Sequence, residues 1–341
     1  MNVKQMGRAQ LDVWVGTLIQ QHRVFAPQAR DGHFVYDQLS GAGDLRLDHD
    51  VTILPPKKYL MPPREAFLTF TRHGEFQTAD HFEPMVLFGV HPYDLAGIAQ
   101  MDRYFTQAPV DGRYLARRRQ TTIVGCDVQN PSPNIFAACM GTATAHEGCD
   151  VLLTLVGEQY VVEARSASGE ALLESAGPLE DADPVNLGRR QQVWLDAEKL
   201  QRRQNLHCRV QDLPSLLDRS ADHPVWHEKS EKCFSCGSCV MVCPSCFCFD
   251  VKDDLEWDLA HGHRWRQWDG CLLTEFALVA GGHNFRKDRE ARYRHRFYRK
   301  GAYLPARCGF VGCVGCGRCV GACTAGIANP VELYNALLEE R

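Results

Sequence analysis

Hydrophobic positions in the first part of the chain recur with helical spacing. Leu11, Trp14, Val15, Leu18 and Ile19 fall three or four residues apart and so lie along one stripe of a helix. The residues between them are mostly polar or small. This pattern predicts an amphipathic helix near the N-terminus, packed by that stripe against a core.

Short apolar runs further along predict buried strands. Residues 85–90 (MVLFGV) and 121–125 (TTIVG) have the length and composition of strands covered on both faces. Residues 150–156 and 159–163 are separated by a two-residue turn that begins at Gly157, which predicts a β-hairpin. Strands alternating with helices favour an α/β arrangement for this part of the chain.

Further helices are expected between and after these strands. Asp94 is a suitable N-cap for a helix with apolar residues at helical spacing. Residues 190–205 predict a mostly polar helix, and a linker follows around residues 220–224. Cysteine density rises after that linker, and a final helix starts at Val331. We therefore place an α/β domain over residues 1–222.

Length and composition exclude several classes of protein. The 341 residues suffice for two or three domains, and the net charge of −4 indicates neither a nucleic-acid partner nor a membrane surface. No apolar run approaches the ~20 residues of a membrane span. Sixteen cysteines without an apparent export leader indicate a cytoplasmic protein whose thiolates bind metal.

Two cysteine motifs carry the most specific chemistry. Both follow the spacing C-x2-C-x2-C-x3-C, by which bacterial-type ferredoxins bind [4Fe-4S] clusters. The motifs are Cys233, Cys236, Cys239, Cys243 and Cys313, Cys316, Cys319, Cys323. We therefore predict a mainly helical, ferredoxin-like dicluster domain over residues 223–341, and an α+β fold for the chain.

The last cysteine of each motif is expected to serve the other cluster, as in two-cluster ferredoxins. Cluster one would then take Cys233, Cys236, Cys239 and Cys323. Cluster two would take Cys313, Cys316, Cys319 and Cys243. Zinc is the first alternative, but zinc sites usually draw on two separated cysteine pairs. A disulfide framework is the second, and it suits small secreted chains instead.

Three further cysteines, Cys246, Cys248 and Cys271, are not needed by the two predicted clusters. One interpretation is a third cluster, completed by Cys308, by His283 or by a ligand that the sequence does not reveal. The other interpretation is that they are buried structural cysteines close to the clusters. The sequence leaves both open.

A strongly basic stretch over residues 286–300 lies between the two motifs. A nucleic-acid patch or a docking face is one interpretation. We favour a helix with Tyr293 and Phe297 packed inward, since they are four residues apart. Several of its arginines would offset the negative charge of nearby thiolate-bound clusters.

Several segments together resemble a known family. They are residues 54–65, 88–95, 125–142, 233–250, 268–271, 281–286 and 312–319. The chain is similar there to the dicluster iron–sulfur (beta) subunits of cytosolic sulfhydrogenase-type NiFe-hydrogenases. The same family includes an iron–sulfur subunit of anaerobic sulfite reductase. The segment PSCFCFD at residues 244–250 is the most specific of these features.

The resemblance implies an electron-transfer subunit that is not itself catalytic. It would relay electrons between the small and large subunits of a hydrogenase and a partner that binds flavin and NAD(P). The alternatives are a role in anaerobic sulfite reductase and a cluster-based redox sensor. The sequence has neither a dinucleotide-binding fingerprint nor a phosphate-binding loop, so substrate chemistry on this chain is not expected.

The chain also departs from the family. Relatives usually have cysteines where this chain has Tyr93, Ile135 and Ala137, whereas Cys126 is retained. Cys126, Cys139 and Cys149 are therefore expected to be buried residues or spare thiols rather than metal ligands.

Overall fold

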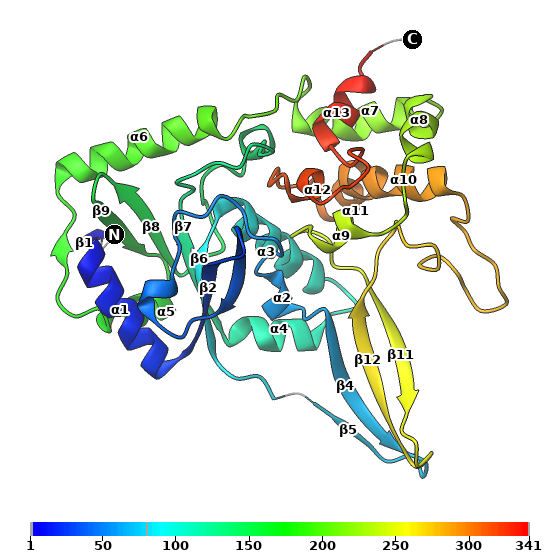
Figure 1. Cartoon of the computed structure of the whole chain (residues 1–341), viewed down its shortest axis with the longest axis horizontal. Coiled ribbons are helices and arrows are strands. Elements are labelled where there is room, and N and C mark those ends of the chain that lie inside the picture. The colour runs from blue at the N-terminus through cyan, green and yellow to red at the C-terminus, as the bar shows by residue number, and fades with distance from the viewer. Residues whose placement is uncertain (1–2, 80, 340–341) are drawn as a thin grey trace.

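The computed structural model describes residues 3–79 and 81–339. Its larger sheet has four central parallel strands, β2, β6, β7 and β8, flanked by antiparallel ones (Figure 1). Across the sheet the strands are β10 (Glu180–Asp181), β1 (Val3–Gly7), β9 (Gln159–Ala164), β8 (Val151–Val156), β7 (Thr121–Cys126), β6 (Met85–Val90), β2 (Arg23–Arg30) and β3 (His33–Gln38).

Helices cover both faces of this sheet, and short helices separated by long loops recur through the cysteine-rich half (Figure 1). In chain order they are α1 (Arg8–Gln21), α2 (Lys57–Leu60), α3 (Pro92–Phe105), α4 (Gly112–Arg119), α5 (Ala167–Glu174), α6 (Pro184–Leu200), α7 (Leu213–Arg219), α8 (Val225–Glu231), α9 (Ser238–Met241), α10 (Arg289–Tyr298), α11 (Leu304–Cys308), α12 (Arg318–Gly321) and α13 (Pro330–Ala336).

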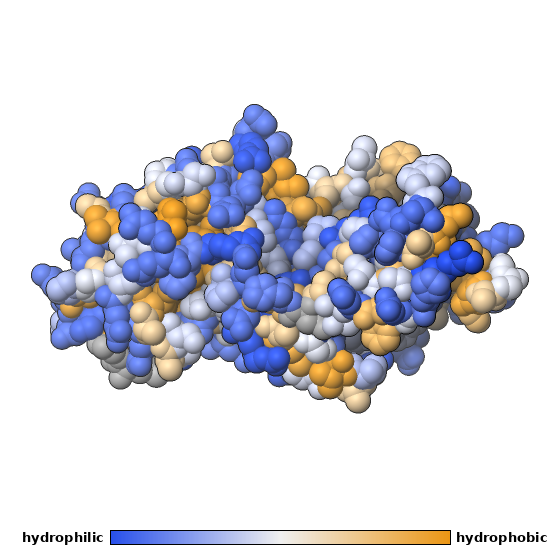
Figure 2. Space-filling model, turned by 90° about the horizontal axis from the view of Figure 1, so that it is seen from below, coloured by the Kyte–Doolittle hydropathy of each residue, from blue (hydrophilic) through white to orange (hydrophobic). Residues whose placement is uncertain are grey.

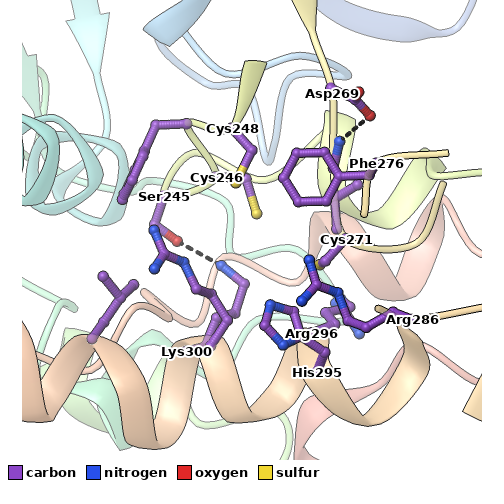
Figure 3. A pocket seen from close by; sticks show the side chains of 15 residues that line it. Ser245, Cys246, Cys248, Asp269, Cys271, Phe276, Arg286, His295, Arg296 and Lys300 are labelled. Atoms are coloured by element: carbon purple, nitrogen blue, oxygen red, sulfur yellow. Dashed lines mark hydrogen bonds between the residues drawn. The ribbon is translucent and has the colours of Figure 1, made fainter. Parts of the chain in front are cut away.

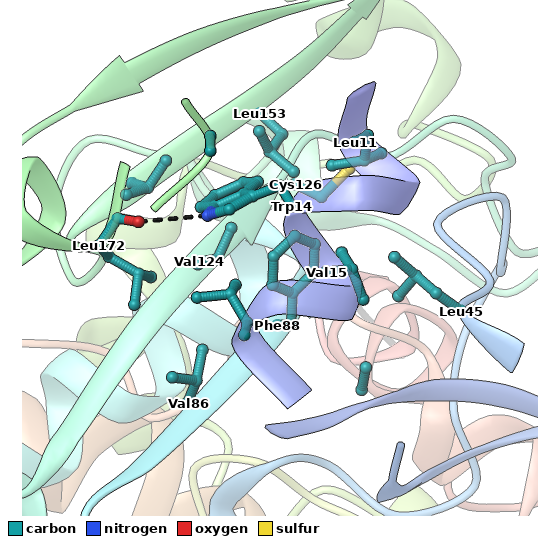
Figure 4. Packing of buried hydrophobic residues seen from close by; sticks show 14 of the residues in the cluster. Leu11, Trp14, Val15, Leu45, Val86, Phe88, Val124, Cys126, Leu153 and Leu172 are labelled. Carbon is teal, nitrogen blue, oxygen red and sulfur yellow. Dashed lines mark hydrogen bonds between the residues drawn. The ribbon is translucent and has the colours of Figure 1, made fainter. Parts of the chain in front are cut away.

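Strand β6 is buried on both faces. Because successive side chains of a strand point to opposite sides, its residues contribute to two different cores. Val86 and Phe88 join the core under α1, where the Trp14 indole packs edge-on to Phe88 and donates a hydrogen bond to the carbonyl of Leu172 (Figure 4). Leu87 instead contributes to the core under α3 and α4. That second core also takes side chains from the cysteine-rich half, so the two halves share apolar contacts.

A separate antiparallel sheet forms an arm that extends away from the larger one (Figure 1). Its strand order is β11 (Phe249–Leu255), β12 (His261–Trp268), β4 (Arg64–Thr71) and β5 (Phe76–Thr78). The β12–β4 pairing joins the segment between the cysteine motifs to the N-terminal part of the chain. The molecular face that includes the arm's free end is mostly hydrophilic, with separate apolar patches (Figure 2).

Most of the predicted local elements are confirmed, and so is the α+β fold. The helix with Trp14, the strands at 85–90 and 121–125 and the hairpin after residue 150 all form. The prediction for Asp94 was wrong. Helix α3 begins at Pro92 behind His91, and Asp94 lies inside its first turn, where its carboxylate binds an arginine instead of capping the helix.

Two other outcomes concern helices. The polar helix predicted over residues 190–205 runs from Pro184 to Leu200, because Asp183 caps it and Pro184 suits a first helical position. Within residues 3–79 and 81–339, the structure has no helix long and apolar enough to cross a membrane.

Candidate iron–sulfur centre

The two cysteine motifs fold into closely similar local structures. Each contains a short helix, α9 or α12, preceded by a glycine in the left-handed region, with φ of 75° at Gly237 and 77° at Gly317. Glycine adopts this conformation without the steric cost that other residues meet. Helices α9 and α12 lie against each other. This contact brings the end of each motif close to the loop of the other.

Four cysteines of the first predicted set line one small cavity. Cys233, Cys236 and Cys239 come from the first motif, and Cys323 comes from the end of the second. Burial, together with the charges of neighbouring cysteines, Cys323 among them, raises the pKa of the Cys239 thiol to about 11, although Arg296 opposes the shift. Iron binding would have to displace that proton, because the thiolate is the ligand.

The second predicted set also comes together. Burial, together with the charges of Cys319 and Cys243, raises the pKa of the Cys313 thiol to about 11, although Lys300 opposes the shift. Burial likewise raises the pKa of Cys316, on which Cys243 and Cys319 both act. Cys243, from the first motif, therefore lies within electrostatic range of the second motif's three loop cysteines.

Buried cations from the basic stretch reach these thiols. The Lys300 ammonium lies 3.2 Å from Cys243 Sγ and donates to Ser245 Oγ at 3.0 Å and to the carbonyl of Gly312 at 2.8 Å. Burial lowers the pKa of Lys300, but the charges of Cys243 and Cys246 outweigh burial, and the pKa lies well above its usual range. Lys300 is therefore charged at neutral pH.

The basic stretch forms a helix, as predicted. Tyr293 and Phe297 are each 1% exposed, with ring centroids 5.1 Å apart. Arg292 and Arg296 are also buried, and the thiolate charge of Cys239 acts on Arg296. Part of the stretch's charge therefore faces the cysteines and is not available at the surface.

A buried ion pair ties the second motif to the larger sheet's helices. Both terminal guanidinium nitrogens of Arg318 bind the Asp94 carboxylate, at 2.6 and 2.7 Å, and Arg318 Nε donates to the carbonyl of Thr52 at 2.7 Å. The side chains are only 2% and 1% exposed. Burial raises the pKa of Asp94, while Arg318 opposes that shift. This bidentate pair fixes Arg318 between Cys316 and Cys319 of the second motif.

The three remaining candidate cysteines, Cys246, Cys248 and Cys271, share another cavity of about 280 Å³. Figure 3 shows the sulfur atoms of Cys246 and Cys271 on opposite sides of this space, with basic side chains below them. The cavity is also lined by His295 of α10. Burial, with the charges of Arg286 and Arg299, lowers the pKa of His295 to about 4, so its imidazole is neutral.

The two named candidates for a fourth ligand here are not brought to this cavity. Cys308 Sγ points to Gln107 Oε1, 3.7 Å away. His283 is exposed and lies edge-on to the ring of Phe285. His295 was not among the candidates expected from the sequence, because a single histidine inside an arginine-rich helix has no distinctive spacing.

The other N-terminal cysteines lie apart from one another. Cys126 is buried in the core under α1, and Cys149 packs against the core on the opposite face of the sheet. Cys139 lies beside Arg202, with an Nη1–Sγ distance of 3.4 Å. Tyr93, Ile135 and Ala137, where the resemblance led us to expect cysteine in relatives, form an apolar cluster with Val314 and Cys316 of the second motif.

The donor set fits iron–sulfur clusters. All sixteen cysteines are free thiols, and eleven of them fall in the three groups described above. Among residues 3–79 and 81–339, no three His, Cys, Asp or Glu side chains converge as ligands of one bare metal ion. The ligands of a cubane cluster lie further apart than those of a single ion, because each of its four irons takes one protein ligand.

Comparison with known proteins agrees with this arrangement. Residues 232–327 match the family of 4Fe-4S dicluster domains. Over 307 residues the chain is 34% identical to sulfhydrogenase 2 subunit beta from Pyrococcus furiosus, and the match covers 89% of each chain. No solved structure matches the chain. The chain therefore belongs to the family of sulfhydrogenase beta subunits and contains a 4Fe-4S dicluster domain.

Proposed function

We propose that this chain is the electron-relay subunit of a cytoplasmic multisubunit NiFe-hydrogenase. It would hold two [4Fe-4S] clusters and pass electrons between the hydrogenase small and large subunits and a partner that binds flavin and NAD(P). The supporting observation is the cavity that Cys323 shares with Cys233, Cys236 and Cys239, since it joins the loop of the first motif to the end of the second. The relative from Pyrococcus furiosus, a sulfhydrogenase subunit, supports the choice of complex.

The crossed ligand sets are part of this proposal. When bound, each [4Fe-4S] cluster exchanges single electrons. The chain's own residues hold the thiolates in place and set the charge around them. Lys300 lies next to Cys243, and the charge of Arg296 acts on both Cys239 and Cys319. Positive charge close to both motifs favours the reduced state of each cluster, because it offsets the added electron.

Reduction of the isolated chain tests the relay. Anaerobically purified protein should contain at least about eight iron atoms and eight acid-labile sulfides. Dithionite should reduce it, whereas NAD(P)H should do so only after the flavoprotein partner is added. Rapid reduction of the pure, flavin-free chain by NAD(P)H would overturn the relay. Stoichiometric zinc with little iron would overturn the cluster assignment itself.

Copurification tests the choice of complex. If the chain serves a hydrogenase, an affinity tag on it should recover a nickel-containing large subunit from anaerobic extracts. A siroheme absorbance in the recovered complex would instead identify a sulfite reductase. An isolated monomer whose clusters respond to oxygen would favour the redox sensor.

A further inference from the structure

We propose that the cavity between Cys246, Cys248 and Cys271 holds a third [4Fe-4S] cluster, with these cysteines as three ligands and His295 at the fourth position. The family match accounts for a dicluster domain and assigns nothing to this cavity. The proposal does not depend on which partner subunits the chain serves.

Ligands from separate segments of the chain converge on this cavity. Cys246 and Cys248 follow the first motif, Cys271 follows strand β12, and His295 lies on α10. All four line one cavity of about 280 Å³, which is far larger than the ~30 Å³ that a water molecule occupies. Figure 3 shows that the His295 ring is on the floor of this cavity, near Cys271.

Positively charged side chains also line the cavity. Arg286, Arg296, Arg299 and Lys300 line it. Within the described part of the chain, none of these four forms an ion pair with a carboxylate. Nε of Arg286 and of Arg296 also lacks a hydrogen-bond partner. Buried charges are costly unless they are paired. A thiolate-ligated cluster is anionic and would supply a partner for Arg286 and Arg299, whereas cysteine charges of the two motifs already act on Arg296 and Lys300.

The cavity lies close to the other two centres. The charge of Cys243 acts on Cys246, and that of Cys239 acts on Cys271. Cys243 belongs to the predicted cluster two and Cys239 to cluster one. A cluster in this cavity would therefore be adjacent to both. Its oxidation by one electron would reduce one of the two neighbouring clusters by one electron.

Iron analysis of the full-length chain tests the proposal. Anaerobically purified protein should contain about twelve iron atoms and twelve sulfides, and Cys271→Ala should reduce both counts to about eight. Cys208→Ala is the matched control, since Cys208 lies in a different groove with none of these ligands, and it should leave the counts unchanged. Folding of each variant is checked by circular dichroism.

Substitution of His295 tests the fourth position. His295→Ala should make one iron labile, converting the cluster to a three-iron form with a distinct electron paramagnetic resonance signal, whereas His295→Cys should keep four irons. Asp269 also lines the cavity and is the rival ligand. If His295→Ala leaves the spectrum unchanged and Asp269→Ala produces the three-iron signal, the assignment of His295 is wrong. If a Cys→Ala variant does not fold, alkylation of the wild-type protein decides, because ligating thiols resist modification.

Two outcomes separate this proposal from the relay. About eight irons, with Cys246, Cys248 and Cys271 freely alkylated, would overturn the third cluster and leave the two motif clusters intact. Fewer than about eight irons in protein that folds would instead contradict the dicluster assignment. Zinc bound at this cavity would also overturn the third cluster.

Discussion

Replacing Lys300 with methionine removes one buried positive charge beside Cys243 and keeps an unbranched side chain of similar length. Lys300 is 6% exposed, so solvent screens its charge little. Its nearest thiol is Cys243 Sγ, 3.2 Å from the ammonium nitrogen. Without this charge, adding an electron to the neighbouring cluster becomes less favourable. We therefore expect Lys300→Met to lower the midpoint potential of the cluster that Cys243 binds.

The size of the shift follows from Coulomb's law. Two unit charges 3.2 Å apart interact by about 5 kcal/mol at an effective dielectric constant of ~20. The added electron is spread over the cubane, so we take about half of this value, or about 2.5 kcal/mol. For a one-electron couple, 59 mV corresponds to about 1.4 kcal/mol. The expected decrease is therefore about 100 mV.

An anaerobic redox titration followed by electron paramagnetic resonance measures this shift. Lys300→Arg keeps the charge and should stay within about 30 mV of the wild type, a shift below about 0.7 kcal/mol for one electron. Lys199→Met removes an exposed charge on α6 and should have no effect. If Lys300→Met retains its full iron content and the potential does not change, Lys300 does not tune the cluster.

Three other predictions concern the structure around the clusters. Asp94→Asn leaves Arg318 buried without its anion and should lower the free energy of unfolding by about 3–5 kcal/mol in denaturant titrations; full stability would contradict the pair's role. Cys323→Ala should abolish the spectroscopic signal of cluster one, which substitution of Cys233, Cys236 or Cys239 should also abolish. Loss of the signal of cluster two instead would refute the crossed ligand sets. Burial lowers the pKa of His49 to about 3 and that of His91 well below its usual range. As the pH decreases below about 6.5, these two histidines therefore bind protons in the unfolded chain before they do so in the folded one. Stability should therefore decrease from about pH 6.5 downward, by up to about 1.4 kcal/mol per pH unit for each histidine, and His49→Phe should reduce that slope in urea titrations.

The sequence predicted well what depends on local spacing. The apolar stripe predicted α1 because a helix that buries one face needs apolar residues every three or four positions. The continuous apolar runs predicted β6 and β7 because strands buried on both faces need apolar residues at successive positions. The cysteine motifs indicated which thiols lie near one another, as Cys233, Cys236, Cys239 and Cys323 do around one cavity. Their assignment as ligands of two clusters stays a prediction. Tyr293 and Phe297 packed as their i,i+4 spacing required.

Contacts between distant segments could not be predicted in the same way. Strand β4 is half-exposed and has a weak alternation, so nothing in its residues indicates a partner beyond the first cysteine motif. Asp94 has the sequence features of a helix cap, but a residue 224 positions away determines its role. His295 was missed for the same reason, because its place beside three cysteines depends on how α10 packs.

Contacts across the predicted domain boundary near residue 222 join the α/β part to the cysteine-rich part. Lys57 donates to the carbonyl of Cys246, and Asp94 holds Arg318. A Cβ at Gly97 of α3 would lie 3.0 Å from Cβ of Pro244, so glycine permits α3 to approach the end of the first motif. These three contacts fix segments next to Cys246, Cys243 and the second motif. If the chain relays electrons as proposed, these contacts give the larger sheet and its helices a role as a rigid support for the thiolates, because electron transfer between clusters needs fixed spacing and no bound substrate.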